Sequence, residues 1–218
     1  MNISRNIRII FIGAPGAGKG TQSDLLARRY KIPKISVGEL LRKLVNNNIS
    51  NNINLGDLIS DSIVCNIVKM RLCKNDCNNG FILDGFPRSI NQAQYLTINN
   101  IKINFVFNIK LSYKIIIKRL LGRRIHKSSG RVYHIKYNPP QVDGLDNVTG
   151  EQLISRKDDN IDIIKHRLKI HNEQITNIIS YYKQEVKLGN ITSYTEIDGN
   201  KSINLILTEI INKINYFI

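Results

Sequence analysis

The sequence predicts an α/β fold in which helices cover both faces of a five-stranded parallel sheet. Short apolar runs alternate along the chain with segments that carry apolar residues at helical spacing, a pattern typical of parallel sheets. A glycine-rich turn joins the first apolar run to the first helical segment. Residues 122–157 depart from this alternation, because short runs broken by Gly, Pro-Pro and Asp-Gly turns indicate an antiparallel β insertion.

The candidate strands are apolar enough to lie inside a sheet. Ile7–Ile12 is interrupted only by Arg8, as expected for a strand buried on both faces. Gly80–Arg88 holds a second buried strand, which ends in Asp84 and a Gly-Phe-Pro turn; ligand residues gather at such carboxyl ends. The other three candidate strands cover residues 32–35, 104–109 and 194–198.

Seven segments are predicted to be helical. Ser36-Val37-Gly38-Glu39 has the form of a capping box, which predicts that a helix begins there. The next helix is expected to begin within residues 58–61 and to bury a stripe made of Ile63, Ile67, Met70 and Leu72. The remaining helices are expected at 22–30, 89–96, 113–121, 160–187 and 202–216, and the Asn-rich residues 46–54 are expected to form a connection.

The glycine-rich turn Gly13–Thr21 predicts a phosphate-binding loop. Its glycines let backbone N–H groups approach an anion, the following helix start adds partial positive charge, and Lys19 adds a full charge. The turn departs from the pattern G-x-x-x-x-G-K-[ST] at Gly20, where a hydroxyl ligand for Mg²⁺ is expected; Thr21 comes one residue later. A nucleotide is the predicted ligand.

Composition limits the functional class. The 218 residues suit one large domain or a core with small inserted subdomains. The formal net charge of +15 fits a nucleic-acid binder, a protein that attracts polyanionic small molecules, or compositional drift toward Ile, Asn and Lys. Because Lys and Arg are spread along the chain without a basic block, drift is favoured over a nucleic-acid site.

The cysteines and the apolar segments bear on the compartment. Three cysteines, no secretory leader and a nucleotide loop predict reduced thiols in a cytoplasmic enzyme without a metal or disulfide framework. No stretch is long and apolar enough to predict a membrane span.

Three motifs in order, at residues 13–22, 35–42 and 80–88, closely resemble adenylate kinase, and Gly20 belongs to that family's version of the loop. Residues 122–126, 130–134, 138–140 and 156–159 resemble its long-form LID, so the similarity runs from about Arg8 to the C-terminus. The resemblance implies a P-loop NTPase-like core (1–35, 60–121 and 160–218), a shortened, helical NMP-binding subdomain (36–59) and an antiparallel β LID (122–159). It also implies a monomer that binds ATP and AMP, with no membrane partner.

By resemblance, the reaction is reversible transfer of the terminal phosphoryl group from MgATP to AMP, giving two ADP. Such chemistry requires positioning and charge neutralisation more than acid–base catalysis, and guanidinium groups suit it because they are permanently charged and bind phosphate through two donors. The implied catalytic residues are Lys19, Asp84, Arg88, Arg123, Arg156 and Arg167. Asp84 is expected to orient water ligands of Mg²⁺, which then needs no direct protein ligand.

The two nucleotides are assigned to separate sets of residues by the same resemblance. The implied ATP-binding residues are Gly16, Ala17, Gly18, Lys19, Gly20, Thr21, Arg123, Val132, Tyr133 and Lys201. The implied AMP-binding residues are Val37, Arg42, Asp57, Leu58, Ile59, Gly85, Phe86, Pro87, Arg88, Gln92, Arg156 and Arg167. Among them Gln92 matches the residue that reads adenine, since an amide can donate to and accept from one base edge.

The sequence departs from the family pattern at several points. Val37 replaces the usual Thr, so we expect weaker AMP affinity or looser base choice. The segment between Arg42 and Leu58 is several residues shorter than in typical bacterial relatives. Where some relatives carry four zinc-binding cysteines, this chain has His126, Ser129, Asp146 and Thr149, which predict a hydrogen-bonded polar cluster without structural zinc.

Two other functions remain open on the sequence. A nucleoside monophosphate kinase with another acceptor, UMP or CMP, is kept open by Val37, although the long LID and Gln92 oppose it. A basic nucleic-acid-binding protein that uses ATP would need aromatic residues interleaved with Lys and Arg, and no such stretch occurs.

Overall fold

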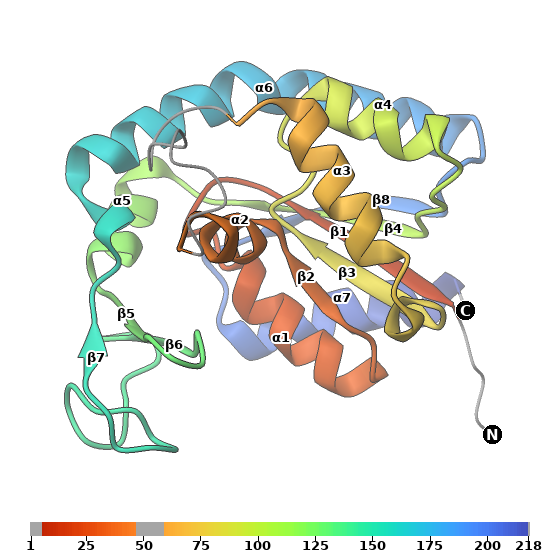
Figure 1. Ribbon diagram of the computed structural model, residues 1–218. Helices are drawn as coiled ribbons and strands as arrows, with labels where there is room; N and C mark the ends of the chain where they lie inside the picture. Colours follow the sequence, from red (N-terminus) through yellow and green to blue (C-terminus); the bar gives the residue numbers. More distant parts are fainter. Residues whose placement is uncertain (1–5, 47–58, 218) are drawn as a thin grey trace.

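The computed structural model describes residues 6–46 and 59–217. Within them, one parallel sheet of five strands has the order β2-β3-β1-β4-β8, which confirms the predicted fold class (Figure 1). Its strands are β1 (Ile7–Ile12), β2 (Lys34–Ser36), β3 (Gly80–Asp84), β4 (Phe105–Lys110) and β8 (Ser193–Asp198). All five carboxyl ends therefore point to one edge of the sheet, where ligand residues collect in such folds.

The described helices agree with the predicted segments within a few residues. They are α1 (Lys19–Tyr30), α2 (Val37–Asn46), α3 (Asp61–Leu72), α4 (Ile90–Ile98), α5 (Tyr113–Leu121), α6 (Ile161–Lys187) and α7 (Ile203–Phe217). Short 3₁₀ turns lie at Asn75–Cys77 and Lys157–Asp159. Capping residues fix the starts of α4 and α6. The Ser89 hydroxyl accepts from the Gln92 backbone N–H (3.2 Å), and the Asn160 side chain accepts from the Asp162 backbone N–H (2.9 Å). None of the helices described is both long and apolar enough to cross a bilayer.

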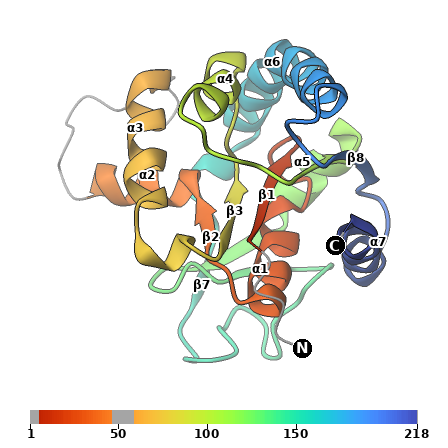
Figure 2. The same cartoon turned by 90° about the vertical axis from the view of Figure 1, so that its right-hand side faces the viewer.

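Alternation along the central strand divides the core into two layers. Ile10 and Ile12 of β1 pack in one hydrophobic cluster with residues of α3, α4 and α6. Ile9 and Phe11 of the same strand pack in a second cluster with residues of α1 and α7. Figure 1 shows these two sets of helices on opposite faces of the sheet, and Figure 2 shows α2 and α3 at the β2 edge and α7 at the β8 edge. Burying both faces requires the nearly continuous apolar strands seen in the sequence.

The apolar face predicted for the third helix is only partly confirmed: of its four residues, Leu72 packs partly buried against the first cluster. Of the predicted stripe, Ile63 and Met70 are 49% and 66% exposed. The buried residues of α3 are Val64, Cys65 and Val68, which pack in the first cluster. The segment is apolar on two neighbouring faces, so periodicity alone could not choose between them; packing against α2 and α4 did. The helix was expected to begin within residues 58–61, and α3 starts at Asp61; Leu58 lies outside the described residues.

Residues 123–154 contain the expected antiparallel insertion. Three strands, β5 (Arg123–His126), β6 (Val132–His134) and β7 (Leu153–Ile154), pair antiparallel in the order β6-β5-β7. Figure 1 shows this small sheet at one end of the molecule, away from α3 and α4. The elements agree with the expected LID, while the subdomain boundaries stay predictions.

The predicted polar cluster of this small sheet is confirmed. His126 Nδ1 lies 2.7 Å from Ser129 Oγ, and its Nε2 lies 3.3 Å from Thr149 Oγ1, which donates to Asp146 at 3.0 Å. The Arg131 guanidinium also binds the buried Asp146 carboxylate through two donors and is the largest cause holding the pKa of Asp146 well below its ordinary value. Side-chain hydrogen bonds thus hold together a sheet too small for an apolar core.

We predict that Gly80→Ala destabilises the fold far more than Gly144→Ala. Gly80 opens β3 with φ of 125°, and an added Cβ would lie 2.2 Å from the Ile7 carbonyl oxygen in β1. Gly144 also has a positive φ, 73°, but nothing lies within 4 Å of its added Cβ. The Gly144 change should cost about 1–2 kcal/mol of unfolding free energy from backbone strain, and the Gly80 change more than about 3 kcal/mol. Urea denaturation measures both, and equal losses would contradict the close approach of β3 to β1.

Candidate functional site

The phosphate loop joins β1 to α1. Because α1 begins at Lys19, the N–H groups of its first turn lack helical acceptors and point out of the helix start together with the positive end of its dipole. Gly18 precedes the helix with φ of 105°, a conformation that side-chain-bearing residues rarely adopt. Gly16, Ala17, Gly18, Gly20 and Thr21, expected to bind nucleotide, all lie in this loop or first turn.

Lys19 is directed into the loop and faces the charged residues around it. Its Nζ donates to the carbonyl oxygens of Gly13 (2.6 Å) and Ala14 (2.8 Å). Burial, the largest cause, lowers the pKa of this ammonium to about 8, and the nearby Asp84 carboxylate opposes the shift. Three guanidinium groups lower it further: those of Arg88, Arg167 and Arg123. Lys19 remains mainly protonated at neutral pH and is part of a larger cationic cluster, defined here as Lys19, Arg42, Arg88, Arg123, Arg156 and Arg167.

Asp84 ends β3 and lies against the start of α1. A Cβ placed on Gly20 would be 3.2 Å from Asp84 Oδ2, closer than most real Cβ contacts. Gly20, which departs from the general loop pattern, thus lacks the side chain that would occupy the space of the Asp84 carboxylate. Serine or threonine at this position and Asp84 in its present place would compete for the same space.

Arg42 and Arg88 meet at the first turn of α2. A Cβ on Gly38 would lie 3.4 Å from Arg42 Nη1 and 3.6 Å from Arg88 Nη2, so both guanidinium groups face the same small residue. Arg88 follows the Gly85-Phe86-Pro87 turn after β3, and its Nε donates to the Gly85 carbonyl oxygen at 2.8 Å. Burial, and next the Arg167 charge, lower the pKa of Arg88 to about 10, which still leaves it protonated at neutral pH.

Two neighbouring carboxylates, Asp159 and Asp158, bind Arg123 and Arg167. Arg123, at the start of β5, binds Asp159 through two donors, one of them Nε at 2.7 Å. Arg167 of α6 donates to Asp158 Oδ2 at 2.9 Å, and Arg42 Nη1 lies 4.0 Å from the same oxygen. Burial opposes ionisation of Asp158, but the surrounding arginines outweigh it and lower its pKa.

Arg156 completes the cluster. Burial, with the charges of Arg123 and Arg42 next, lowers its pKa to about 10, and its Nε is buried without a hydrogen-bond partner among the described residues. An unpaired buried donor costs free energy, so a ligand oxygen at this position would be favoured. In the cluster the cations outnumber the carboxylates Asp84, Asp158 and Asp159, and the excess positive charge suits a polyphosphate.

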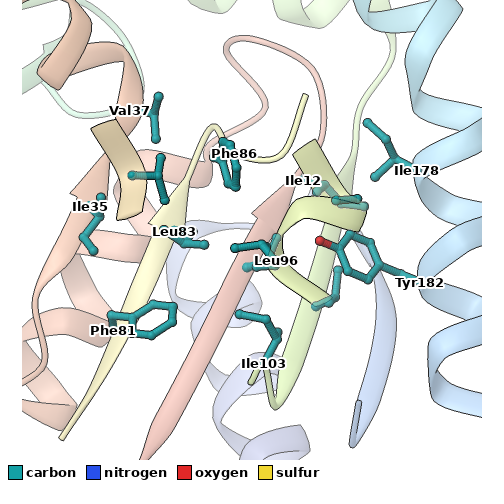
Figure 3. Close-up of a cluster of buried hydrophobic side chains, with 14 of the residues drawn as sticks. Ile12, Ile35, Val37, Phe81, Leu83, Phe86, Leu96, Ile103, Ile178 and Tyr182 are labelled. Atoms are coloured by element: carbon teal, nitrogen blue, oxygen red, sulfur yellow. The ribbon is translucent and has the colours of Figure 1, made fainter. Parts of the chain in front are cut away.

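A more apolar group of residues adjoins Arg88. Val37 and Phe86 are buried in the first hydrophobic cluster, and Figure 3 shows both at the ends of β2 and β3. Ile59 packs partly buried against the same cluster. Gln92 of α4 is 5% exposed and accepts the Arg88 backbone N–H at 2.8 Å. Asp57 and Leu58 lie outside the described residues, as do most of the shortened segment and its Asn-rich part.

Three residues assigned to ATP make contacts away from the phosphate loop. The Tyr133 hydroxyl donates to Asp146 (2.8 Å) inside the small sheet, and Lys201 pairs with Glu209 (2.7 Å). Val132 is 40% exposed on β6. No hydrogen bond or ion pair among the described residues joins any of these side chains to Lys19, so their part in binding ATP stays a prediction.

Two residues at the site, Arg119 and His171, carried no signal in the sequence. Arg119 of α5 donates to the Gly199 carbonyl oxygen (2.9 Å) and lies over the Tyr137 ring, 5.4 Å from its centroid. His171 lies one turn after Arg167 on α6, and burial with the Lys19 and Arg88 charges lowers its pKa to about 4, which leaves it neutral at pH 7. Both are ordinary charged or polar positions of amphipathic helices, so only the packing distinguishes them.

Asp84 is the side chain beside the phosphate loop that could serve a metal ion. Within residues 6–46 and 59–217, no group of three or more His, Cys, Asp and Glu side chains could hold a metal ion. Asp84, in the space left by Gly20, supplies one hard carboxylate next to Lys19. Mg²⁺ binds few protein carboxylates and keeps water and phosphate ligands, so this donor fits an ion that arrives with a nucleotide.

Comparison with known proteins agrees with this geometry. A family model described as adenylate kinase matches residues 11–187. The adenylate kinase of Buchnera aphidicola subsp. Schizaphis graminum (strain Sg) is 45% identical over 210 residues, which cover 94% of this chain and 98% of the relative. Those of Blochmanniella pennsylvanica (strain BPEN) and Francisella tularensis subsp. novicida (strain U112) are 43% and 40% identical over 216 residues, or 96% of this chain and 99% of each relative. With a lysine-bearing glycine loop, an arginine cluster at the strand ends and a match along most of its length, the chain belongs to the adenylate kinase family.

Proposed function

We propose that this enzyme transfers the terminal phosphoryl group of MgATP to AMP, reversibly, giving two ADP. The observation that carries the proposal is the convergence of Lys19, Arg88, Arg123 and Arg167 with Asp84 at the carboxyl edge of the sheet. The triphosphate of ATP and the phosphate of AMP can approach end to end only where their mutual repulsion is offset. A cluster of fixed cations does this without reorganising during the reaction.

ATP is assigned to the phosphate loop. The N–H groups at the start of α1 and the Lys19 ammonium would hold its β- and γ-phosphates, and Arg123, Arg156 and Arg167 would surround the transferred group. Bound Mg²⁺ neutralises phosphate charge, and Asp84 is the residue placed to orient its water ligands. Arg119, between the loop, the Gly199 turn and Tyr137, is suited to the nucleoside end of ATP, together with Val132, Tyr133 and Lys201.

AMP is assigned to the group around α2 and α4. Arg42 and Arg88 face one another across Gly38 and would bind the AMP phosphate through paired N–H donors. Val37, Ile59, Gly85, Phe86 and Pro87 would form the apolar wall, with Gln92 reading the base. Because Val37 is buried in an apolar cluster, it supplies shape but no hydrogen bond, which supports the expectation of weaker AMP affinity or looser base choice.

The division into core (1–35, 60–121 and 160–218), NMP-binding subdomain (36–59) and LID (122–159) is part of the proposal. The two insertions would close over AMP and ATP and exclude water, which otherwise competes with AMP as the acceptor. The proposal includes a monomer in the cytoplasm, as the family resemblance implies.

The enzyme should form ADP from MgATP only when a nucleoside monophosphate is present. A coupled assay with AMP, CMP, UMP and GMP measures this, and we expect the highest kcat/KM with AMP because Gln92 matches adenine. Faster phosphorylation of UMP or CMP would replace the proposal with a pyrimidine monophosphate kinase. Hydrolysis of ATP that needs no acceptor would contradict both.

Arg88→Ala should lower kcat/KM by roughly 10²–10³-fold, because it removes a cation that faces Lys19 and Arg167. The matched control is Arg71→Ala: Arg71 pairs with Asp76 at 2.6 Å outside the cluster, and loss of such a surface pair has little effect. The control should stay within about twofold of the unmodified enzyme, on the scale of small surface effects. An Arg88→Ala enzyme of full activity would remove this residue from its assigned role.

Gly20→Ala should lower kcat by about tenfold, because its Cβ would press on Asp84 and move the carboxylate that serves Mg²⁺. Alanine is the better helix former, so thermal stability should not fall. Steady-state kinetics at several Mg²⁺ concentrations and a thermal melt separate the two effects. Arg28→Ala, on the exposed face of α1, is the control; a Gly20→Ala enzyme with unchanged kcat and Mg²⁺ dependence would disprove the link to Asp84.

A further inference from the structure

Asp61, the first residue of α3, contacts the Gln92 side chain and the α4 cap. Its Oδ1 accepts from Gln92 Nε2 at 2.6 Å, and its Oδ2 accepts from Ser89 Oγ at 2.6 Å. The Ser89 hydroxyl in turn caps α4 by accepting a hydrogen bond from the Gln92 backbone N–H. One carboxylate thus joins the start of α3 to the first turn of α4, next to Arg88.

These contacts fix which way the Gln92 amide faces. Its Oε1 accepts the Arg88 backbone N–H at 2.8 Å, and its Nε2 donates to Asp61. A backbone N–H can only donate, and an ionised carboxylate can only accept. Turning the amide over would set two donors together at Arg88 and two acceptors together at Asp61. Both neighbours therefore oppose the reversed orientation.

The fixed amide has a defined capacity for a ligand. Its oxygen can accept a second hydrogen bond, and its nitrogen has a second hydrogen to donate. Adenine offers a matching pair, an amino hydrogen and the unprotonated ring nitrogen beside it. Hypoxanthine has the same ring size, but it offers a carbonyl oxygen and a ring N–H at those two positions. It would therefore meet acceptor with acceptor and donor with donor, and buried polar groups left unpaired in this way reject a ligand.

We propose that Asp61 is a positioning residue that sets acceptor-base specificity by holding the Gln92 amide in its adenine-reading orientation. The proposal rests on the proposed function, in which Gln92 reads the base of AMP. A carboxylate suits this role because hydrogen bonds to an ionised acceptor are about twice as strong as neutral ones. Asp61 acts through Gln92 and does not itself touch AMP.

The test compares Asp61→Ala with the unmodified enzyme, using AMP and inosine monophosphate as acceptors. We expect KM for AMP to rise about tenfold, with kcat and KM for ATP within about twofold, because the charge-assisted bond to Gln92 is lost while the cationic cluster is kept. The ratio of kcat/KM for AMP to that for inosine monophosphate should fall about tenfold, because only the Arg88 N–H still opposes the reversed amide. An unchanged ratio would overturn the proposal.

Ser89→Ala distinguishes positioning of Gln92 from a general structural role. It removes the α4 cap and the second bond to Asp61, but it leaves the bond between Asp61 and Gln92. The base ratio, defined as kcat/KM for AMP divided by kcat/KM for inosine monophosphate, should therefore stay within about twofold of the unmodified enzyme, while stability falls by the usual amount for a lost cap. A ratio that falls as far as in Asp61→Ala would assign the effect to the helix start and overturn the proposal.

Asp61→Asn provides the alternative test of the proposal if the Asp61→Ala variant does not fold. Its neutral oxygen is a weaker acceptor for Gln92 Nε2, so the base ratio should fall about threefold, between the alanine variant and the unmodified enzyme. A ratio equal to that of the unmodified enzyme would overturn the proposal in that case. An unmodified enzyme that does not phosphorylate AMP at all would refute the proposed function instead, before any variant is compared.

Discussion

The cationic cluster stays together because burial and mutual repulsion are opposed by three carboxylates. Desolvation lowers the pKa of Lys19 to about 8 and those of Arg88 and Arg156 to about 10, yet each group keeps its proton at neutral pH. Asp158 and Asp159 bind Arg167 and Arg123, and Asp84 faces Lys19. The positive charge that remains in excess can be neutralised by phosphate groups. The repulsion among the clustered cations therefore favours binding of phosphate-bearing ligands.

The parallel sheet makes this arrangement possible. Strands β1 and β3 are neighbours, so the phosphate loop after one and Asp84 with Arg88 after the other are held at the same edge. Gly20 lets the two approach, since its missing side chain leaves space for the carboxylate. The long helix α6 adds Arg167 and His171, which lie far from the phosphate loop in the sequence. The apolar strands that build the two core layers thereby also fix the positions of the charged groups.

Sequence reasoning found the parts of the site that follow directly from a strand. Lys19 follows a buried strand through the glycine loop and Asp84 ends another, and that context gives a lysine or an aspartate a predictable place. The roles of Arg42, Arg88, Arg123, Arg156 and Arg167 were assigned only through the family resemblance, because an arginine is usually a surface charge. Arg119, His171 and Asp61 were not assigned, and the buried face of α3 was predicted one stripe away from Val64 and Val68.

The sequence by itself determined the alternation of strands and helices, the phosphate loop and the antiparallel insertion. These features follow from local periodicity, turn chemistry and capping, which depend on residues a few positions apart. The tertiary structure alone decided which face of α3 is buried, that Gly20 makes room for Asp84, and that Asp61 reaches Gln92 across 31 residues of chain. The reason is physical: such contacts depend on how whole elements pack, and packing is set by the shape of every neighbouring side chain at once.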